Sequence, residues 1–355
     1  MTTDTFGGVW TYALELIQAL NQQGVEVVLA TMGAPLRVEQ RQEVQQIPGL
    51  EVFESCWKLE WMEDCWPEVQ KAGQWLLQLE QQLQPDLVHL NGYVHGKLPW
   101  QNPTLVVGHS CVLSWWQAVK GQAAPASWER YQQEVTQGLQ AADLVITPSA
   151  AMLVDLKQHY GLLPHGRVVP NGRSFNSLTP GVKANWVFSA GRLWDEAKNL
   201  AALEQIAPEL PWPIYVAGDQ KHPNGSCAQL SALRPLGRLS PQEISAWLAR
   251  TAIYALPARY EPFGLSILEA GLAGCALVLG DIPSLREVWE DSALFVPPND
   301  TQKLKATLQN LMVNASHRNQ LAARARARAL EFTPQRMAAG YLAAYRDLIH
   351  GHQRG

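Results

Sequence analysis

The chain has 355 residues, with 28 lysines and arginines against 32 aspartates and glutamates, giving a net charge of −4. That length predicts two domains, and the small acidic excess argues against a general nucleic-acid binder, which needs clustered positive charge. The five cysteines form no CxxC pair, so they indicate reduced thiols and neither a disulfide framework nor a zinc site. No apolar run approaches the roughly 18 residues of a membrane span, and nothing after Met1 resembles a secretion signal, so we expect a cytoplasmic protein.

Short apolar runs alternate with longer helical patterns in the first half of the chain. Near-continuous apolar runs are typical of strands in a parallel sheet that is covered on both faces. The predicted strands are 25–30, 87–90, 105–107, 144–147 and 167–169. The predicted helices are 9–22, 68–84, 127–141 and 150–160. Strand followed by helix, repeated, predicts βαβ units and a doubly wound α/β domain.

A stretch rich in proline and glycine interrupts this rhythm, and a second series of the same kind follows it. The predicted strands of this series are 186–190, 214–217, 253–256, 276–279 and 293–296. Its predicted helices are 200–207, 241–250, 265–273, 301–311 and a last stretch, 318–350, punctuated at Thr333–Pro334. We therefore predict a first domain over 1–165, a linker over 166–184, a second domain over 185–335 and a helix and tail over 336–355. Two such α/β halves should face each other across a ligand-binding cleft.

The segment EPFGLSILEA, residues 261–270, directly follows a predicted strand, and its proline and glycine predict a tight loop before a helix. A helix N-terminus of this kind favours an electron-rich ligand oxygen. The amides placed there are those of Phe263, Gly264 and Leu265. Glu261 and Glu269 are separated by about 12 Å along a helix, too far for the paired carboxylates of a retaining glycosidase. They suit the two ends of one long ligand such as a nucleotide sugar; an exposed loop glutamate and a solvated helix glutamate are the alternative.

Two cations follow the predicted strand 186–190, at the entry to a helix. A glycine, Arg192, Lys198 and a helix N-terminus at a strand end together predict an anion site. The alternative is two surface cations paired with the neighbouring Asp195 and Glu196.

The first half of the chain offers two further candidates. Gly7 and Gly8 precede the first predicted helix, and paired glycines let a ligand approach the backbone, although a plain tight turn is the alternative. His109 ends a predicted strand and should face the cleft, with a buried structural histidine as the alternative. His89 and His95 have no convergent acidic or thiol partner in the sequence pattern, so we predict no metal site.

The pattern EPFGLSILEA resembles the retaining nucleotide-sugar glycosyltransferases of family 4, which have the GT-B fold of two Rossmann-like domains. DTFGGVWTYALELIQAL is similar to the family's glycine loop and first helix, and SAGRLWDEAKNL is similar to its phosphate-binding segment. VVPNG, VAGD, LGRLS and GCALVLGDIPSLREVW match further landmarks in the usual order, so the resemblance extends from Asp4 to about Tyr345.

The resemblance implies transfer of a sugar from a nucleotide diphosphate sugar to a hydroxyl acceptor, with retention of anomeric configuration. The implied catalytic residues are Arg192, Lys198, Glu261 and His109. The implied donor-binding residues are Gly7, Gly8, Phe263, Gly264, Leu265 and Glu269. The two cations would neutralise the leaving diphosphate, His109 would orient the transferred sugar or the acceptor, and Glu269 would bind the ribose. Here the lysine follows the arginine by six residues, where the common family form has five.

No metal and no cofactor are implied, because the cations and helix N-termini do the work of a divalent ion. The expected partners are the nucleotide-sugar donor and an unidentified acceptor, either a sugar, a glycan or a lipid-linked molecule, which leaves room for peripheral membrane contact. The C-terminal helix is expected to return to the first domain. Two alternatives stay open. One is another GT-B enzyme, such as a glycan phosphorylase or a sugar-nucleotide epimerase, and the other is a non-catalytic subunit that binds a nucleotide sugar or a partner protein.

The start of the chain carries a separate expectation. Only Met1 to Asp4 precede the glycine loop, and Thr2, Thr3 and Asp4 are not an apolar run. Strands usually have about 5–6 residues, so the first strand should be truncated. Either the start codon lies further upstream, or the first sheet lacks its central strand.

Overall fold

The computed structural model describes residues 1–163, 165–174, 180–220 and 230–352. Residues 175–179 of the predicted linker, Cys227 and the tail residues 353–355 lie outside these ranges. The chain forms two compact units. The first consists of Met1–Gln117, Gln122–Gly172 and Pro334–Gly355, and the second of Ala118–Gly121 and Arg173–Thr333. Each unit is described below by itself.

The first unit holds two parallel sheets. One has the order β3-β2-β1, with β1 at Thr2–Asp4, β2 at Val28–Met32 and β3 at Glu51–Glu54. The other has the order β4-β5-β6-β7, with β4 at Val88–Leu90, β5 at Thr104–Val107, β6 at Leu144–Thr147 and β7 at Gly166–Val168. Strand β7 pairs with β6 and lies one residue ahead of the strand predicted at 167–169.

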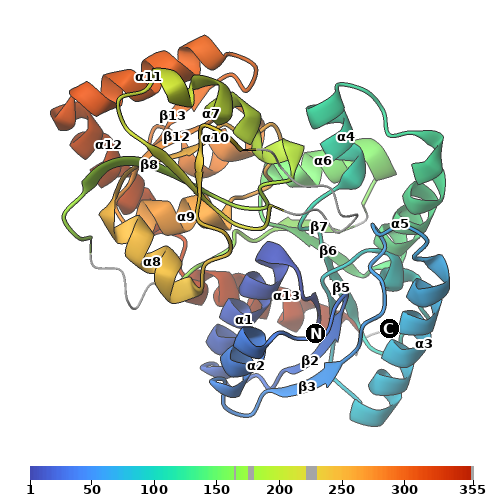
Figure 1. The fold of residues 1–355 in the computed structure, drawn as a ribbon. Coiled ribbons are helices and arrows are strands. Elements are labelled where there is room, and N and C mark those ends of the chain that lie inside the picture. Colours follow the sequence, from blue (N-terminus) through green and yellow to red (C-terminus); the bar gives the residue numbers. More distant parts are fainter. Residues whose placement is uncertain (164, 175–179, 221–229, 353–355) are drawn as a thin grey trace. The chain divides into compact units, whose positions relative to one another are not determined.

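Helices flank the strands of the first unit. They are α1 (Gly7–Asn21), α2 (Val38–Gln45), α3 (Trp66–Leu83), α4 (Val112–Lys120), α5 (Glu129–Ala141), α6 (Ala150–Tyr160) and α13 (Pro334–His352), with short 3₁₀ turns η1 (Val94–Lys97) and η2 (Ala126–Trp128). Strand β2 divides two cores, because Leu29 packs with α1 whereas Ala30 and Met32 pack with α3. Helix α13 contacts α1 (Figure 1), so the C-terminal helix returns to the first unit as predicted.

The beginning of the chain differs from expectation. Residues 2–4 form β1, which pairs with β2 from Thr2↔Ala30 to Asp4↔Met32, and Thr2 and Thr3 are buried. The strand has three residues, short as expected, but it is present, so the alternative in which the first sheet lacks it is wrong. Threonine is β-branched and favours extended backbone, so a polar pair is compatible with a buried strand when its hydroxyls find partners. Asn91, just after β4, supplies one: its backbone N–H donates to Oγ1 of Thr2 at 2.9 Å.

The second unit holds one six-stranded parallel sheet with the order β10-β9-β8-β11-β12-β13. Its strands are β8 (Ala184–Ala190), β9 (Ile214–Ala217), β10 (Arg234–Pro235), β11 (Thr251–Leu256), β12 (Ala276–Gly280) and β13 (Leu294–Val296). Its helices are α7 (Leu200–Ile206), α8 (Pro241–Arg250), α9 (Leu265–Leu272), α10 (Pro283–Trp289), α11 (Thr301–Val313) and α12 (Ala315–Ala329), with 3₁₀ turns η3 (Glu196–Lys198) and η4 (Ala207–Glu209). Every strand predicted for this half of the chain is present.

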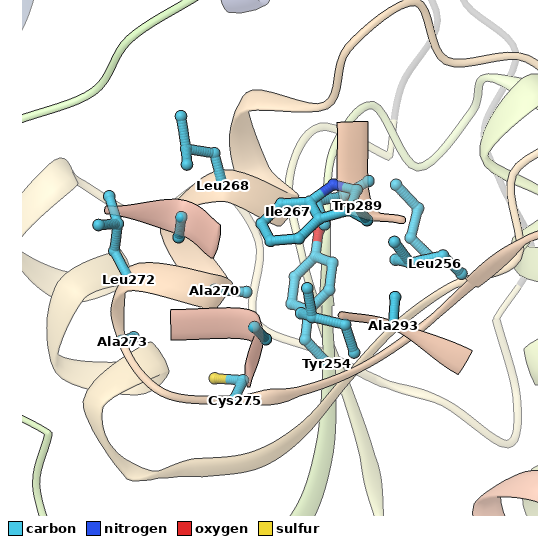
Figure 2. Close-up of a cluster of buried hydrophobic side chains, with 14 of the residues drawn as sticks. Tyr254, Leu256, Ile267, Leu268, Ala270, Leu272, Ala273, Cys275, Trp289 and Ala293 are labelled. Atoms are coloured by element: carbon cyan, nitrogen blue, oxygen red, sulfur yellow. The ribbon is translucent and has the colours of Figure 1, made fainter. Parts of the chain in front are cut away.

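The central strand β11 shows how this sheet is covered on both faces. Tyr254 and Leu256 pack into a core with α9 and α10, where Ile267 and Trp289 lie against them (Figure 2). The alternate residues of β11 pack into a second core with α7 and α11. Side chains of a strand point to opposite faces in turn, so an unbroken apolar strand requires apolar helices on both sides. The unit is a doubly wound α/β layer structure.

Candidate functional site

The loop from β11 to α9 places the helix N-terminus where the sequence predicts it. Gly264 precedes α9 with φ of 88°, a left-handed conformation that favours glycine. A Cβ at this position would lie 2.6 Å from Cδ1 of Ile267, so the end of that side chain would have to shift as well. Phe263, the residue before Gly264, is buried in the core and so anchors the loop. The helix begins at Leu265. The N–H of Ile267 already donates to the oxygen of Gly264 at 3.0 Å, whereas the first helical amides, those of Leu265 and Ser266, precede any intrahelical acceptor and can serve a ligand.

Lys198 and Glu261, both predicted as catalytic, are in direct contact. Nζ of Lys198 donates to Oε2 of Glu261 at 2.6 Å, and the two side chains are 15% and 12% exposed. Ser284, in the first turn of α10, donates its hydroxyl to the backbone oxygen of Glu261 at 2.6 Å and fixes the loop. The stem of Lys198 lies over Gly191, where a Cβ would sit 3.5 Å from Cε of the lysine. The ion pair therefore joins the loop after β8 to the loop after β11, two neighbouring strands.

Arg192 has a different environment from Lys198. Its Nη2 donates to Oδ2 of Asp195 at 2.8 Å, and its guanidinium lies 5.2 Å from the ring of Trp194. Asp195 is buried and also accepts the N–H of Ala197, so it is fixed as the cap of η3. Arg192 itself is 46% exposed. The guanidinium of the arginine is thus held by Asp195 and Trp194 while much of the side chain faces solvent, whereas the lysine is largely buried.

Glu269, the predicted ribose-binding residue, is paired with a residue that the sequence analysis did not single out. Nε of Arg173 donates to Oε1 of Glu269 at 2.9 Å, and both side chains are mostly buried. Arg173 directly follows VVPNG, a segment noted only as a landmark. A second omission is Asn199, next to Lys198, which adopts the left-handed conformation that asparagine tolerates. Its Nδ2 donates to the carbonyls of Pro257 and Pro298, and so ties η3 to the ends of β11 and β13.

The first unit contains the other predicted residues. Helix α1 begins at Gly7, two residues earlier than predicted, because Gly7 and Gly8 are its first residues; both are exposed. His109 follows β5 and is half-buried, with Nε2 2.8 Å from Oδ1 of Asn91 and its ring edge-on to Tyr12. Burial lowers the pKa of His109 to about 3, so the imidazole is neutral at physiological pH. A neutral ring of this kind can orient a substrate through hydrogen bonds.

The predicted site residues therefore fall into two sets, one in each unit. Gly7, Gly8 and His109 lie in the first unit, and Arg192, Lys198, Glu261, Phe263, Gly264, Leu265 and Glu269 lie in the second. Across the described ranges, no three histidine, cysteine, aspartate or glutamate side chains converge to hold a metal ion. None of the helices in the described part of the chain has both the length and the apolar character to cross a membrane.

Comparison with known families identifies the class of protein. The family model for Glycosyltransferase Family 4 matches residues 6–175, and the model for Glycosyl transferases group 1 matches residues 173–328. Together they run from the glycine loop of the first unit to the end of the second unit's helix α12. The chain belongs to the GT-B glycosyltransferases of the family 4 type.

Individual relatives agree with this assignment. O-antigen chain mannosyltransferase B of Escherichia coli is 31% identical over 42% of this chain and 43% of its own length. Glycogen synthase of Mycobacterium tuberculosis is 30% identical over 52% of this chain and 50% of its own. The chain thus spans about half the length of these curated relatives.

Solved structures share the fold over nearly the whole chain. Sucrose-phosphate synthase from Thermosynechococcus elongatus superposes with a TM-score of 0.81 at 19% identity, over 99% of this chain and 96% of that one. Anabaena HepE in complex with UDP-glucose superposes with a TM-score of 0.73 at 18% identity, over 98% of this chain and all of that one. At this level of identity the likeness establishes the fold, and the two-domain GT-B prediction is confirmed.

Proposed function

We propose that the protein transfers a sugar from a nucleoside diphosphate sugar to a hydroxyl acceptor, with retention of anomeric configuration and without a metal ion. The observation that carries this proposal is the contact between Lys198 and Glu261 beside the N-terminus of α9. A buried cation, a carboxylate and free helix amides at the end of two parallel strands can bind a ligand that has both anionic and hydroxyl groups. A nucleotide sugar has both.

In this proposal, different residues of the second unit bind different parts of the donor. Lys198 and Arg192 balance the negative charge that develops on the diphosphate as the glycosidic bond breaks, which is the usual task of preorganised cations at a leaving group. Glu261 and the amides ahead of α9 bind hydroxyls of the transferred sugar. Glu269, further along the same helix, accepts hydrogen bonds from the ribose. With two cations on the diphosphate, a divalent ion is not required.

The relatives narrow the donors worth testing. Of the relatives described above, one is a mannosyltransferase and one is a glycogen synthase, and one structural neighbour was crystallised with UDP-glucose. We therefore propose a hexose donor, and the acceptor is a hydroxyl of a sugar, a glycan or a lipid-linked molecule. His109 of the first unit orients that acceptor or the transferred sugar.

The test is a nucleotide-release assay with UDP-, GDP- and ADP-hexoses, run with and without a chelator, with the Glu261→Gln variant as the control. The proposal expects release from one donor class, stimulated by an acceptor, insensitive to the chelator and abolished in the variant. Proton NMR of the product gives its anomeric configuration, and inversion would overturn retention. Donor binding by calorimetry without release from any donor would instead support a non-catalytic nucleotide-sugar-binding subunit.

A further inference from the structure

Asn91 lies beside His109 in the first unit, and its orientation is fixed by the neighbouring strand. Nδ2 of Asn91 donates to the backbone oxygen of Thr2 at 2.7 Å, and the backbone N–H of Asn91 donates to the hydroxyl of the same threonine. A carbonyl oxygen cannot donate, so the amide nitrogen must face Thr2. The Oδ1 atom of Asn91 therefore faces the histidines on its other side.

This orientation determines the tautomer of His109. Nε2 of His109 lies 2.8 Å from Oδ1 of Asn91, and an amide oxygen only accepts hydrogen bonds. Nε2 must therefore carry the proton. The ring is neutral, so its Nδ1 atom carries a lone pair and can accept a hydrogen bond from a hydroxyl group.

A second histidine extends the same hydrogen-bond chain into the core. Nε2 of His89 lies 3.3 Å from Oδ1 of Asn91 and 3.4 Å from the hydroxyl of Tyr12, and Nδ1 lies 2.7 Å from the hydroxyl of Tyr345. Because Oδ1 only accepts whereas both hydroxyls can donate or accept, we assign the proton to Nε2, and Nδ1 then accepts from Tyr345. Tyr345 lies on α13, the C-terminal helix, and His89 is further fixed by stacking on Tyr341 of that helix. Burial lowers the pKa of His89 well below its ordinary value, so this ring is neutral as well.

We propose that Asn91 is a positioning residue, which holds His109 in the Nε2–H tautomer and presents Nδ1 as the acceptor for a hydroxyl of the bound sugar or of the acceptor. Tyr345 on the C-terminal helix fixes the other end of this series of hydrogen bonds by bonding to His89. The inference about substrate rests on the proposed glycosyl transfer. The tautomer itself does not, and it can be measured without turnover.

The direct test is ¹⁵N NMR of the full chain labelled at the histidine rings, with the His109→Asn spectrum used to assign His109. The expected result is a protonated Nε2 and an unprotonated Nδ1 for His109. Asn91→Asp keeps an oxygen acceptor and should preserve this tautomer, whereas Asn91→Leu should give a mixture. A protonated Nδ1 in the unmodified protein, or an unchanged tautomer in Asn91→Leu, overturns the proposal.

The kinetic test separates positioning from stability. Asn91→Leu should lower kcat by about 10- to 100-fold, as loss of an orienting partner commonly does, with little change in the dissociation constant of the donor. Asn91→Asp keeps the acceptor for His109 but replaces the donor to the Thr2 carbonyl with an oxygen, so it should recover part of that loss. Asn102→Leu, which removes a half-buried asparagine bonded elsewhere in the same unit, should leave kcat near its original value. Equal losses in the leucine and aspartate variants would mean that Asn91 only supports the fold.

The series of hydrogen bonds from His109 through Asn91 and His89 to Tyr345 can still be tested if Asn91→Leu does not fold. Tyr345→Phe removes the 2.7 Å partner of His89 Nδ1 and leaves Nε2 between two longer contacts, to Asn91 at 3.3 Å and to the Tyr12 hydroxyl at 3.4 Å. Nε2 can then also accept from Tyr12, so part of the His89 population should shift to the other tautomer. Tyr160→Phe is the matched control, because the hydroxyl of this buried tyrosine contacts Cys111 and takes no part in this series of hydrogen bonds. An unchanged His89 tautomer in Tyr345→Phe would remove the C-terminal helix from the proposal.

Discussion

The ion pair between Lys198 and Glu261 allows structure and function to be separated by a double-mutant cycle. The two side chains are mostly buried and their charged atoms lie 2.6 Å apart. A hydrogen bond between charged groups contributes about 1.5–3 kcal/mol, and removing one partner of a buried pair leaves the other charge uncompensated. We therefore expect Lys198→Met and Glu261→Gln each to lower the free energy of unfolding of the second unit by about 2–3 kcal/mol.

The double variant distinguishes the two roles. Each single variant already loses the whole interaction. The loss of unfolding free energy in the double variant should therefore be smaller than the sum of the two single losses by about 1.5 kcal/mol or more. Activity should behave differently, because in the proposed reaction both groups also act on the donor. All three variants should lose about 10² or more in kcat, and neutralising both charges should restore none of it.

The assay is urea unfolding followed by hydrogen exchange of the β8 and β11 amides, which report on the second unit alone. Lys305 and Glu209 form a matched control in the same unit, with Nζ and Oε2 2.8 Å apart but the glutamate 56% exposed. Their cycle should give a coupling of only about 0.2–1 kcal/mol. A coupling between Lys198 and Glu261 no larger than this, or a double variant with restored turnover, would refute the reasoning.

Four further outcomes are expected. Glu269→Ala should weaken nucleotide binding about tenfold or more in calorimetry, because one charge-assisted bond is lost. Arg192→Ala should lower kcat by about 10² and the unfolding free energy by about 1–2 kcal/mol, because the buried Asp195 loses this partner although the arginine itself is half exposed. Gly264→Ala should cost about 1–3 kcal/mol of stability in urea, since it forces a left-handed alanine. The pKa of His109 is lowered on folding from about 6.5 to about 3, so stability is fully present above about pH 6.5 and is lost as the pH falls toward 3. Between pH 7 and 5 the loss should approach about 2 kcal/mol, and His109→Asn should reduce this slope whereas the exposed His317→Asn should not.

The elements that the sequence predicts well are those with a strong local signal. Strands β6 and β9 and helices α6 and α8 have the predicted bounds. Both helices begin with a serine cap, and Ser240 also forms a capping box with Glu243 ahead of Pro241, so their first residues are marked locally. The unpredicted α2 and β3 lack such signals. Helix α2 is polar apart from Val38 and Val44 and buries only Gln40, and β3 is an edge strand of half-buried and exposed residues.

Site residues were predictable where one short segment carries them. Glu261, Gly264 and Glu269 lie within ten residues, and the strand, the turn glycine and the helix that place them are all visible locally. Their partners were not predictable in this way. Arg173 is 96 positions from Glu269 and meets it only because the second unit folds. A local pattern can identify a candidate residue, but the charge that balances it comes from tertiary structure.

The pairings of the second unit explain how its charges can be buried before a ligand binds. Lys198 is balanced by Glu261, Glu269 by Arg173, and Arg192 by Asp195. Burying unpaired charges would cost several kcal/mol for each, so the site needs these internal partners in order to be preformed. A diphosphate that approaches the cations must then compete with the carboxylates for them. Arg192, being half exposed, can make that exchange at the least cost. Lys198 is largely buried, and it can contact a phosphate by donating from another N–H group while it stays bonded to Glu261. In the proposed reaction, this would couple the position of the sugar-binding carboxylate to the charge on the leaving group.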